Sequence, residues 1–162
     1  MERKNDILCD AIDVENLFSQ WHPDVRKFVE KIDKDCALKI IQNTLISTFQ
    51  SIRVNELLNF ANTDNCKRIL DRIINEKNIS NFFSILKERD NLYPRDISRK
   101  YSIEQIFESI EKNNYNPLLF LVLNNKYYII DGRTRFYCCM FLNIPARVRI
   151  VLDNKLNENC RK

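Results

Sequence analysis

The chain has 162 residues, of which 44% are apolar and 30% are charged, and its net charge is +4 at pH 7. This composition excludes an intrinsically disordered chain, and no apolar run approaches the ~18 residues of a membrane span, so we expect no membrane partner. One glycine and four prolines argue against an all-β fold and favour long helices. Residues 1–86 carry a net charge of −1 (12 Lys and Arg, 13 Asp and Glu), whereas residues 87–162 carry +5 (14 and 9). An anionic partner is therefore expected on the second part, although a solvated, mildly basic surface explains the excess equally well.

Six cysteines are scattered along the chain without any CxxC pair: Cys9, Cys36, Cys66, Cys138, Cys139 and Cys160. This irregular spacing argues against a disulfide framework, and the opening residues Met-Glu-Arg-Lys-Asn-Asp do not resemble a secretion signal. We therefore expect free thiols in a reducing, cytoplasmic compartment. We expect no metal-ligating cluster of the zinc type, because His22 is the single histidine and the cysteines are dispersed.

Helical periodicity dominates residues 1–86, where we expect a helical bundle or interaction region. The segment His22-Pro23-Asp24 is typical of a helix start, with proline at the first helical position and an acid beside it. A broad apolar face at helical spacing follows between Ala37 and Ile52. Residues 79–86 are ambiguous, because their apolar side chains fit either a last helix or the first strand of a second domain. We expect the helices of residues 1–86 to pack on that domain, to form a homodimer or to bind a partner protein.

From residue 87 onward the pattern predicts a small α/β domain over residues 87–155, followed by a polar tail over residues 156–162. Ser102 and Gln105 form a capping-box pattern at the start of a helix. Two apolar strands follow, at residues 118–123 and 126–130, joined by a tight turn. A helix and a half-exposed alternating strand complete the pattern, at residues 134–142 and 146–152. The expected class is α+β, with an all-helical N-terminal region and a small α/β domain after it.

The segment Asp131-Gly132-Arg133-Thr134-Arg135 separates the second strand from the next helix and contains the only glycine of the chain. Glycine permits a sharp turn, and the first N–H groups of a helix, which lack partners, favour an anion. Arg133 and Arg135 add planar guanidinium groups suited to phosphate oxygens, and Thr134 adds a hydroxyl. Asp131 can orient an arginine, hold a metal-bound water or act as a base. The alternative is a two-residue hairpin at Asp131-Gly132, in which the arginines are ordinary exposed charges.

The stretch from Tyr128 to Ile150 resembles the second conserved box of ParB-type amino-terminal domains, in the ParB/sulfiredoxin superfamily. In that family a strand runs into a Gly-x-x-Arg turn, an apolar helix follows, and a Gly or Asn turn, a proline and a final strand complete the box. The upstream order also matches, with an Arg-bearing loop, a Ser-capped helix ending in Ser109-Ile110, and Asn116-Pro117 before an apolar strand. The resemblance covers residues 91–151 and favours the helix over the hairpin.

The resemblance implies that the turn and an upstream arginine bind the phosphate of a nucleotide or of DNA. By position, Gly132 and Arg135 match the invariant residues of the family's turn. The upstream arginine is Arg95 or Arg99, and the spacing does not decide between them. Arg133 stands where sulfiredoxins have their catalytic cysteine, which argues against sulfiredoxin activity. Partition proteins usually have glutamate at this position, so the sequence also departs from the proteins that switch with CTP. The chain also ends soon after the domain, without a helix-turn-helix, which argues against a full partition protein.

These observations lead to two functional hypotheses. The first is a nucleotide-binding ParB-like enzyme that hydrolyses a nucleoside triphosphate, or acts on a phosphate ester or a nucleic-acid backbone as a phosphotransferase or nuclease. It would use Mg²⁺ with CTP or ATP, and Asp131 and Glu104 are its acid, base or metal-binding candidates. The second is a non-catalytic module that holds DNA or a partner protein with the same basic residues. A second carboxylate near Asp131 favours the enzyme, and an open basic face without one favours the module.

Overall fold

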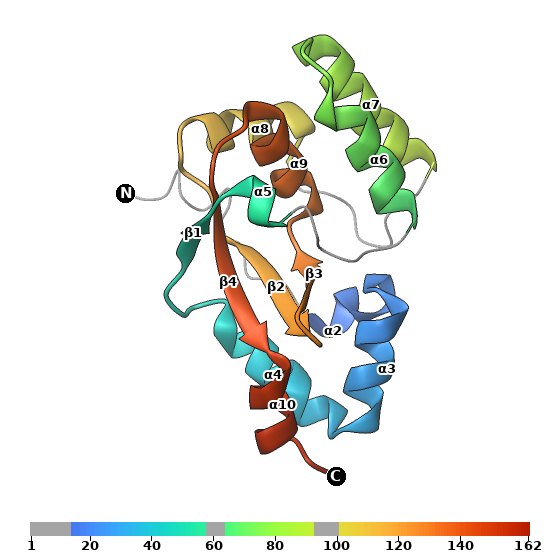
Figure 1. Ribbon diagram of the computed structural model, residues 1–162, viewed down its shortest axis with the longest axis vertical. Helices are drawn as coiled ribbons and strands as arrows, with labels where there is room; N and C mark the ends of the chain where they lie inside the picture. Colours follow the sequence, from blue (N-terminus) through green and yellow to red (C-terminus); the bar gives the residue numbers. More distant parts are fainter. Residues whose placement is uncertain (1–13, 58–63, 93–100) are drawn as a thin grey trace.

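The computed structural model describes residues 14–57, 64–92 and 101–162, with a mixed sheet at its centre (Figure 1). The strands are β1 (Gln50–Ile52), β2 (Leu118–Leu123), β3 (Lys126–Asp131) and β4 (Ala146–Leu152), in the spatial order β1-β4-β2-β3. β2 and β3 form an antiparallel hairpin, β4 returns parallel to β2, and β1 pairs antiparallel with β4. A parallel return requires a crossover connection, and helix α9 (Arg133–Leu142) lies in it, directly after β3.

Helices cover both faces of the sheet, so the chain forms three layers (Figure 1). Along β2, Leu118 and Phe120 face one helical layer while Leu119 and Leu121 face the other, and all four are fully buried. A strand buried on both faces accounts for the uninterrupted apolar run in the sequence. The first layer contains α5 (Val54–Leu57), α6 (Asp64–Ile74), α7 (Ile79–Leu92), α8 (Ile103–Glu111) and α9. The second contains α2 (Val14–Leu17), the 3₁₀ helix η1 (Phe18–Gln20), α3 (Pro23–Lys31), α4 (Lys34–Thr44) and α10 (Asp153–Asn159).

Local capping explains where the helices of the second layer begin. His22 Nδ1 accepts a hydrogen bond from the Asp24 N–H at 3.0 Å, and Pro23 occupies the first helical position of α3. Asp33 Oδ1 accepts one from the Cys36 N–H at 3.2 Å at the start of α4. The His22 ring also packs edge-on against Tyr128 of β3, with 5.0 Å between centroids. The single histidine therefore caps α3 and fastens it to the sheet.

The described part of residues 1–86 is not all-helical, although the sequence predicts helices throughout this region. β1 lies within this region and forms one edge of the sheet, whereas the ambiguous segment 79–86 is helical. A single hydrophobic cluster joins Leu57 of α5 and Phe82 of α7 with Phe120 of β2. The core thus crosses the expected boundary after residue 86. The physical reason is that a sheet with two apolar faces needs helices on both faces. Here these helices come from both sides of residue 86 in the sequence.

The C-terminal segment also takes part in the fold. The expected polar tail, residues 156–162, begins inside α10, and Leu156 and Cys160 are 0% and 1% exposed. Both belong to the cluster between the sheet and the second layer. The sequence did not predict this packing, because the segment is mostly polar and only two of its residues are buried.

Four cysteines are described with their side chains, and all four are free thiols, as expected: Cys36, Cys138, Cys139 and Cys160. Cys138 and Cys139 are fully buried in α9, and the Cys139 sulfur lies 3.9 Å from the Tyr115 hydroxyl. The expectation for Cys9 and Cys66 concerns side chains outside the described part of the structure. Among the described helices, none is both long and apolar enough to cross a membrane.

Candidate functional site

The predicted strand–turn–helix is present at Gly132, and the alternative hairpin is not formed. β3 ends at Asp131, α9 begins at Arg133, and Gly132 between them has a φ of 109°. Residues with a side chain rarely adopt this conformation. A Cβ atom added to Gly132 would lie 2.9 Å from Cγ of Leu118 and 3.2 Å from a terminal nitrogen of Arg135. Both the backbone conformation and the lack of space therefore require glycine here.

The first turn of α9 presents main-chain N–H donors at this point. The Phe136 N–H donates to the Gly132 carbonyl oxygen at 2.8 Å, which begins the hydrogen-bond pattern of the helix. The N–H groups of Arg133, Thr134 and Arg135 precede that bond and have no acceptor within the helix. Together with the helix dipole they create a positive potential that favours an anion.

Arg135 folds back onto the turn. Its guanidinium donates to Asp131 Oδ2 at 2.6 Å, to the Pro117 carbonyl oxygen at 3.2 Å and, through a short contact, to the Asn116 carbonyl oxygen. The side chains of Arg135 and Asp131 are 12% and 19% exposed. Arg135 therefore ties the turn to the start of β2, and Asp131, the predicted acid or base, is held in an ion pair with it.

Thr134 is buried and receives a hydrogen bond from a residue that the sequence did not identify. Arg89, near the end of α7, donates to Thr134 Oγ1 at 3.0 Å and to Asp90 Oδ1 at 2.8 Å. Its guanidinium carbon lies 5.5 Å from the centre of the Tyr137 ring, and its side chain is 12% exposed. A third arginine therefore reaches the first turn of α9, and it brings Asp90 with it.

The sequence contains a weak indication that Arg89 faces the protein interior. Phe82, Ile85, Leu86 and Arg89 follow helical spacing, which places the arginine on the apolar stripe of α7. An arginine at such a position requires a partner inside the protein. The partner is 45 residues away in the chain, and local sequence patterns do not indicate a contact at that distance.

The other predicted site residues lie in different surroundings. Arg133 reaches toward the second helical layer, where its Nη2 lies 3.4 Å from the Gln20 carbonyl oxygen. Glu104 is half-exposed and pairs with Lys87 at 2.6 Å, and this hydrogen bond lowers its pKa. Asp90, and not Glu104, is the second carboxylate near the turn, because Arg89 contacts both Asp90 and Thr134. Arg95 and Arg99 fall outside the described residues.

The turn thus combines two guanidinium groups, from Arg89 and Arg135, with two carboxylates and helix N–H donors, whereas Arg133 belongs to the turn but reaches toward Gln20. Arg89 and Arg135 balance the charges of Asp90 and Asp131, so Arg133 is the excess positive charge. Each carboxylate is already held by an arginine, so the arrangement favours binding of an anion over binding of a bare cation. Within the described residues, no three His, Cys, Asp or Glu side chains are grouped as metal ligands.

No family model matches the chain, and comparisons with curated proteins and with solved structures give no match either. The likeness to ParB-type domains therefore rests on the motifs of this sequence, and the site is interpreted from its own geometry.

Proposed function

We propose that the Gly132 turn binds a phosphate group of a nucleotide, and that the protein is a nucleotide-binding protein of the ParB-like type. The observation that carries this proposal is the contact of Arg89 with Thr134, because it adds a guanidinium group from α7 to the first turn of α9. Main-chain donors at a helix start and guanidinium groups from two other directions are complementary to phosphate oxygens. The basic excess of residues 87–162 is consistent with an anionic ligand.

Within this proposal the arginines have different roles. Arg133 has a main-chain oxygen among its acceptors, and Arg89 has the Thr134 hydroxyl besides the Asp90 carboxylate. A phosphate can replace the main-chain or hydroxyl oxygen at small cost. Arg135 has a carboxylate and two carbonyl oxygens, which a phosphate would leave without donors. We therefore assign direct contacts to Arg89 and Arg133, and assign to Arg135 the positioning of the turn.

The proposed reaction is hydrolysis of a nucleoside triphosphate or transfer of its phosphoryl group, with Mg²⁺ carried by the phosphates of CTP or ATP. Asp131 is the proposed base, and it must first exchange its bond with Arg135 for a substrate or water. Glu104 remains a more remote candidate, in its exposed pair with Lys87.

A second function is favoured by the pairing of both carboxylates at the turn. Asp90 and Asp131 are each bound to an arginine, so neither is free to act as a base in this state. The same donors would then serve a non-catalytic module that binds the backbone of DNA, or a partner protein. Such binding would fall steeply with salt, whereas binding of a nucleotide in a small site depends on salt much less.

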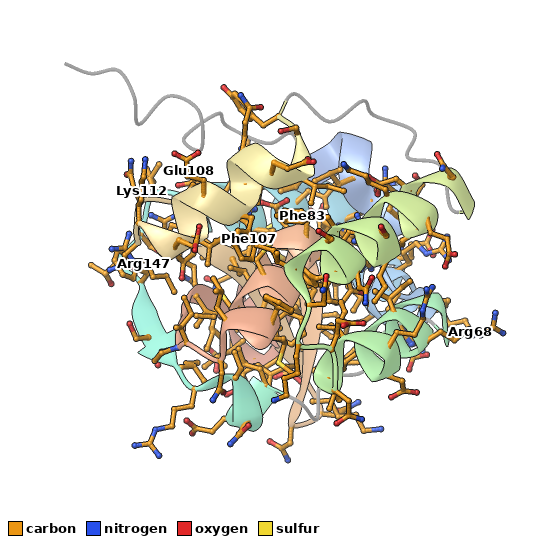
Figure 2. All side chains as sticks on the ribbon, turned by 90° about the horizontal axis from the view of Figure 1, so that it is seen from above. Arg68, Phe83, Phe107, Glu108, Lys112 and Arg147 are labelled. Atoms are coloured by element: carbon orange, nitrogen blue, oxygen red, sulfur yellow. The ribbon has the colours of Figure 1, made fainter. Side chains whose placement is uncertain are left out.

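The test is a titration of the protein with CTP and ATP, each with and without Mg²⁺, followed by thermal shift and calorimetry. Arg133→Ala and Arg89→Lys should weaken nucleotide binding about ten- to a hundred-fold, since each loses charge-assisted hydrogen bonds of ~1.5–3 kcal/mol. Arg68→Ala is the matched control, because this arginine is exposed on α6 and points away from the protein (Figure 2). Phosphate release, measured in the same samples, separates the enzyme from the binding module.

Three outcomes distinguish a nucleotide-binding site, a DNA-binding module and a purely structural role of the arginines. Nucleotide binding that Arg133→Ala weakens and Arg68→Ala leaves unchanged supports the proposed site. Binding of duplex DNA that is weakened by the same variant and by added salt, without nucleotide binding, favours the module. Equal affinities for all variants and every ligand would show that the arginines serve the fold alone.

A further inference from the structure

The thiols of Cys36 and Cys160 meet where the end of α10 packs against the start of α4. Cys36 lies in the first turn of α4, and its Sγ donates to the Asn159 carbonyl oxygen at 3.3 Å. Cys160 follows α10, and its carbonyl oxygen accepts from the Asp33 N–H at 2.7 Å. These two bonds lie on either side of the cysteine pair and hold the backbone of α10 close to that of α4, and Cys36 lies near enough to Cys160 to raise the pKa of its thiol.

We propose that Cys36 and Cys160 form a reversible disulfide that fastens α10 to α4 under oxidising conditions. Both thiols are free in the structure, and neither belongs to the candidate phosphate site. A disulfide forms without backbone movement when the two Cα atoms lie within about 7 Å, and the two flanking hydrogen bonds bring α4 and α10 together at these cysteines. The other two described thiols, Cys138 and Cys139, are fully buried in α9 and are shielded from oxidants.

The order of reaction follows from exposure. Cys36 is half-buried, whereas Cys160 is 1% exposed, so Cys36 meets the oxidant first. Burial raises the pKa of the Cys160 thiol, and Cys36 and Asp33 raise it further, which keeps Cys160 protonated in the reduced protein.

With a small disulfide such as oxidised glutathione, the chemistry has two exchange steps. The Cys36 thiolate attacks one glutathione sulfur, the S–S bond of glutathione breaks, and one reduced glutathione leaves as a thiol. The Cys160 thiol then loses its proton and attacks the Cys36 sulfur, which releases the second reduced glutathione. The two cysteines are oxidised, one glutathione disulfide is reduced, and a dithiol reductant reverses both steps.

The expected effect is stabilisation of the whole sheet. All four strands lie between Cys36 and Cys160 in the sequence, so the bond closes a loop that contains the sheet. Closing a loop of this length restricts the unfolded chain strongly, and we expect the midpoint of thermal unfolding to rise by about 5–15 °C.

The test is incubation with oxidised glutathione, followed by blocking of free thiols, proteolysis and mass spectrometry. The expected product is a peptide pair joined through Cys36 and Cys160, lost on reduction and accompanied by the higher unfolding midpoint. Cys36→Ser and Cys160→Ala should each abolish both the joined pair and the oxidation-dependent rise. As a matched control, the double variant Cys9→Ser, Cys66→Ser should behave like the wild type.

Three results would overturn the proposal: Cys36 joined to any other cysteine, Cys36 left as a stable glutathione adduct, or an oxidised protein with an unchanged unfolding midpoint. Because the wild-type protein is compared with itself in the two redox states, reduced stability of either single variant does not affect the conclusion.

Discussion

Replacing Arg135 by alanine removes every donor that this side chain supplies to the Gly132 turn. Asp131 loses an ion-pair partner at 2.6 Å, and the carbonyl oxygens of Asn116 and Pro117 lose the guanidinium that joins them to α9. These acceptors belong to two segments, the end of β3 and the approach to β2. The substitution therefore tests whether one arginine holds the turn against the sheet.

The magnitude follows from burial. The side chains of Arg135 and Asp131 are 12% and 19% exposed, so water replaces the lost donors only in part. An exposed pair contributes about 0–1 kcal/mol, whereas hydrogen bonds to charged groups inside a protein contribute ~1.5–3 kcal/mol each. For Arg135→Ala we expect the free energy of unfolding to fall by about 2–4 kcal/mol, and the thermal midpoint to fall by roughly 5–15 °C.

The assay is urea unfolding of Arg135→Ala, Asp131→Asn and the double variant, with Arg68→Ala as the exposed-arginine control. The two single losses should not add, because both remove the same ion pair, and the coupling free energy should exceed about 0.5 kcal/mol. An Arg135→Ala protein that unfolds within about 0.5 kcal/mol of the wild type, as is usual for surface substitutions, would refute the positioning role.

Three further variants test local features of the fold, one of them at the Gly132 turn. Gly132→Ala should lower the free energy of unfolding by about 1–3 kcal/mol, because the new Cβ meets Leu118 at 2.9 Å and φ is 109°, and an unchanged urea midpoint would contradict this. Burial raises the pKa of Tyr115 to about 12, although the hydrogen bond from the Arg147 N–H opposes this shift. The neutral phenol therefore contributes about 3 kcal/mol of stability below pH ~10, which is lost as pH rises from ~10 to 12. Tyr115→Phe should flatten the alkaline fall, which unfolding curves at several pH values would measure; a curve of unchanged steepness would assign the fall to other groups. Asp33→Ala removes the cap of α4 and should cost about 1 kcal/mol in urea unfolding, more than the exposed Asp35→Ala, and equal losses would argue against the cap.

The second half of the fold could be predicted closely because residues with special backbone conformations mark its boundaries. Asn124 and Asn125 have φ angles of 53° and 65° in the β2–β3 turn, and Asn143 ends α9 with a φ of 54°. Asparagine and glycine tolerate this left-handed region better than other residues, so their positions predict turns and helix ends. The same reasoning placed the strand–turn–helix at Gly132, and the structure confirms it.

Non-local contacts could not be predicted in this way. β1 has three residues, two of them exposed, and it becomes a strand because β4 lies beside it. The contact of Arg89 with Thr134 depends on how α7 packs against α9, which no local pattern encodes. For the candidate site, the sequence therefore indicated which residues form the turn, but it did not indicate the contacts of Arg135 with Asn116 and Pro117, and it omitted Arg89.

Two roles of Arg135, positioning the turn and binding the phosphate, can be separated by experiment. Loss of the first lowers the free energy of unfolding, and loss of the second lowers nucleotide affinity. If Arg135 holds the turn, Arg135→Lys lowers the free energy of unfolding, since a single ammonium group cannot reach Asp131 and both carbonyl oxygens with the same geometry. Nucleotide affinity, measured well below the unfolding midpoint, should then fall less for Arg135→Lys than for Arg133→Ala. If Arg135 instead binds the phosphate, its internal contacts are exchanged for the ligand, and the loss should appear mainly in affinity. The buried ion pair and the two carbonyl contacts predict the first pattern, and a stable Arg135→Lys protein with lost affinity would require the second.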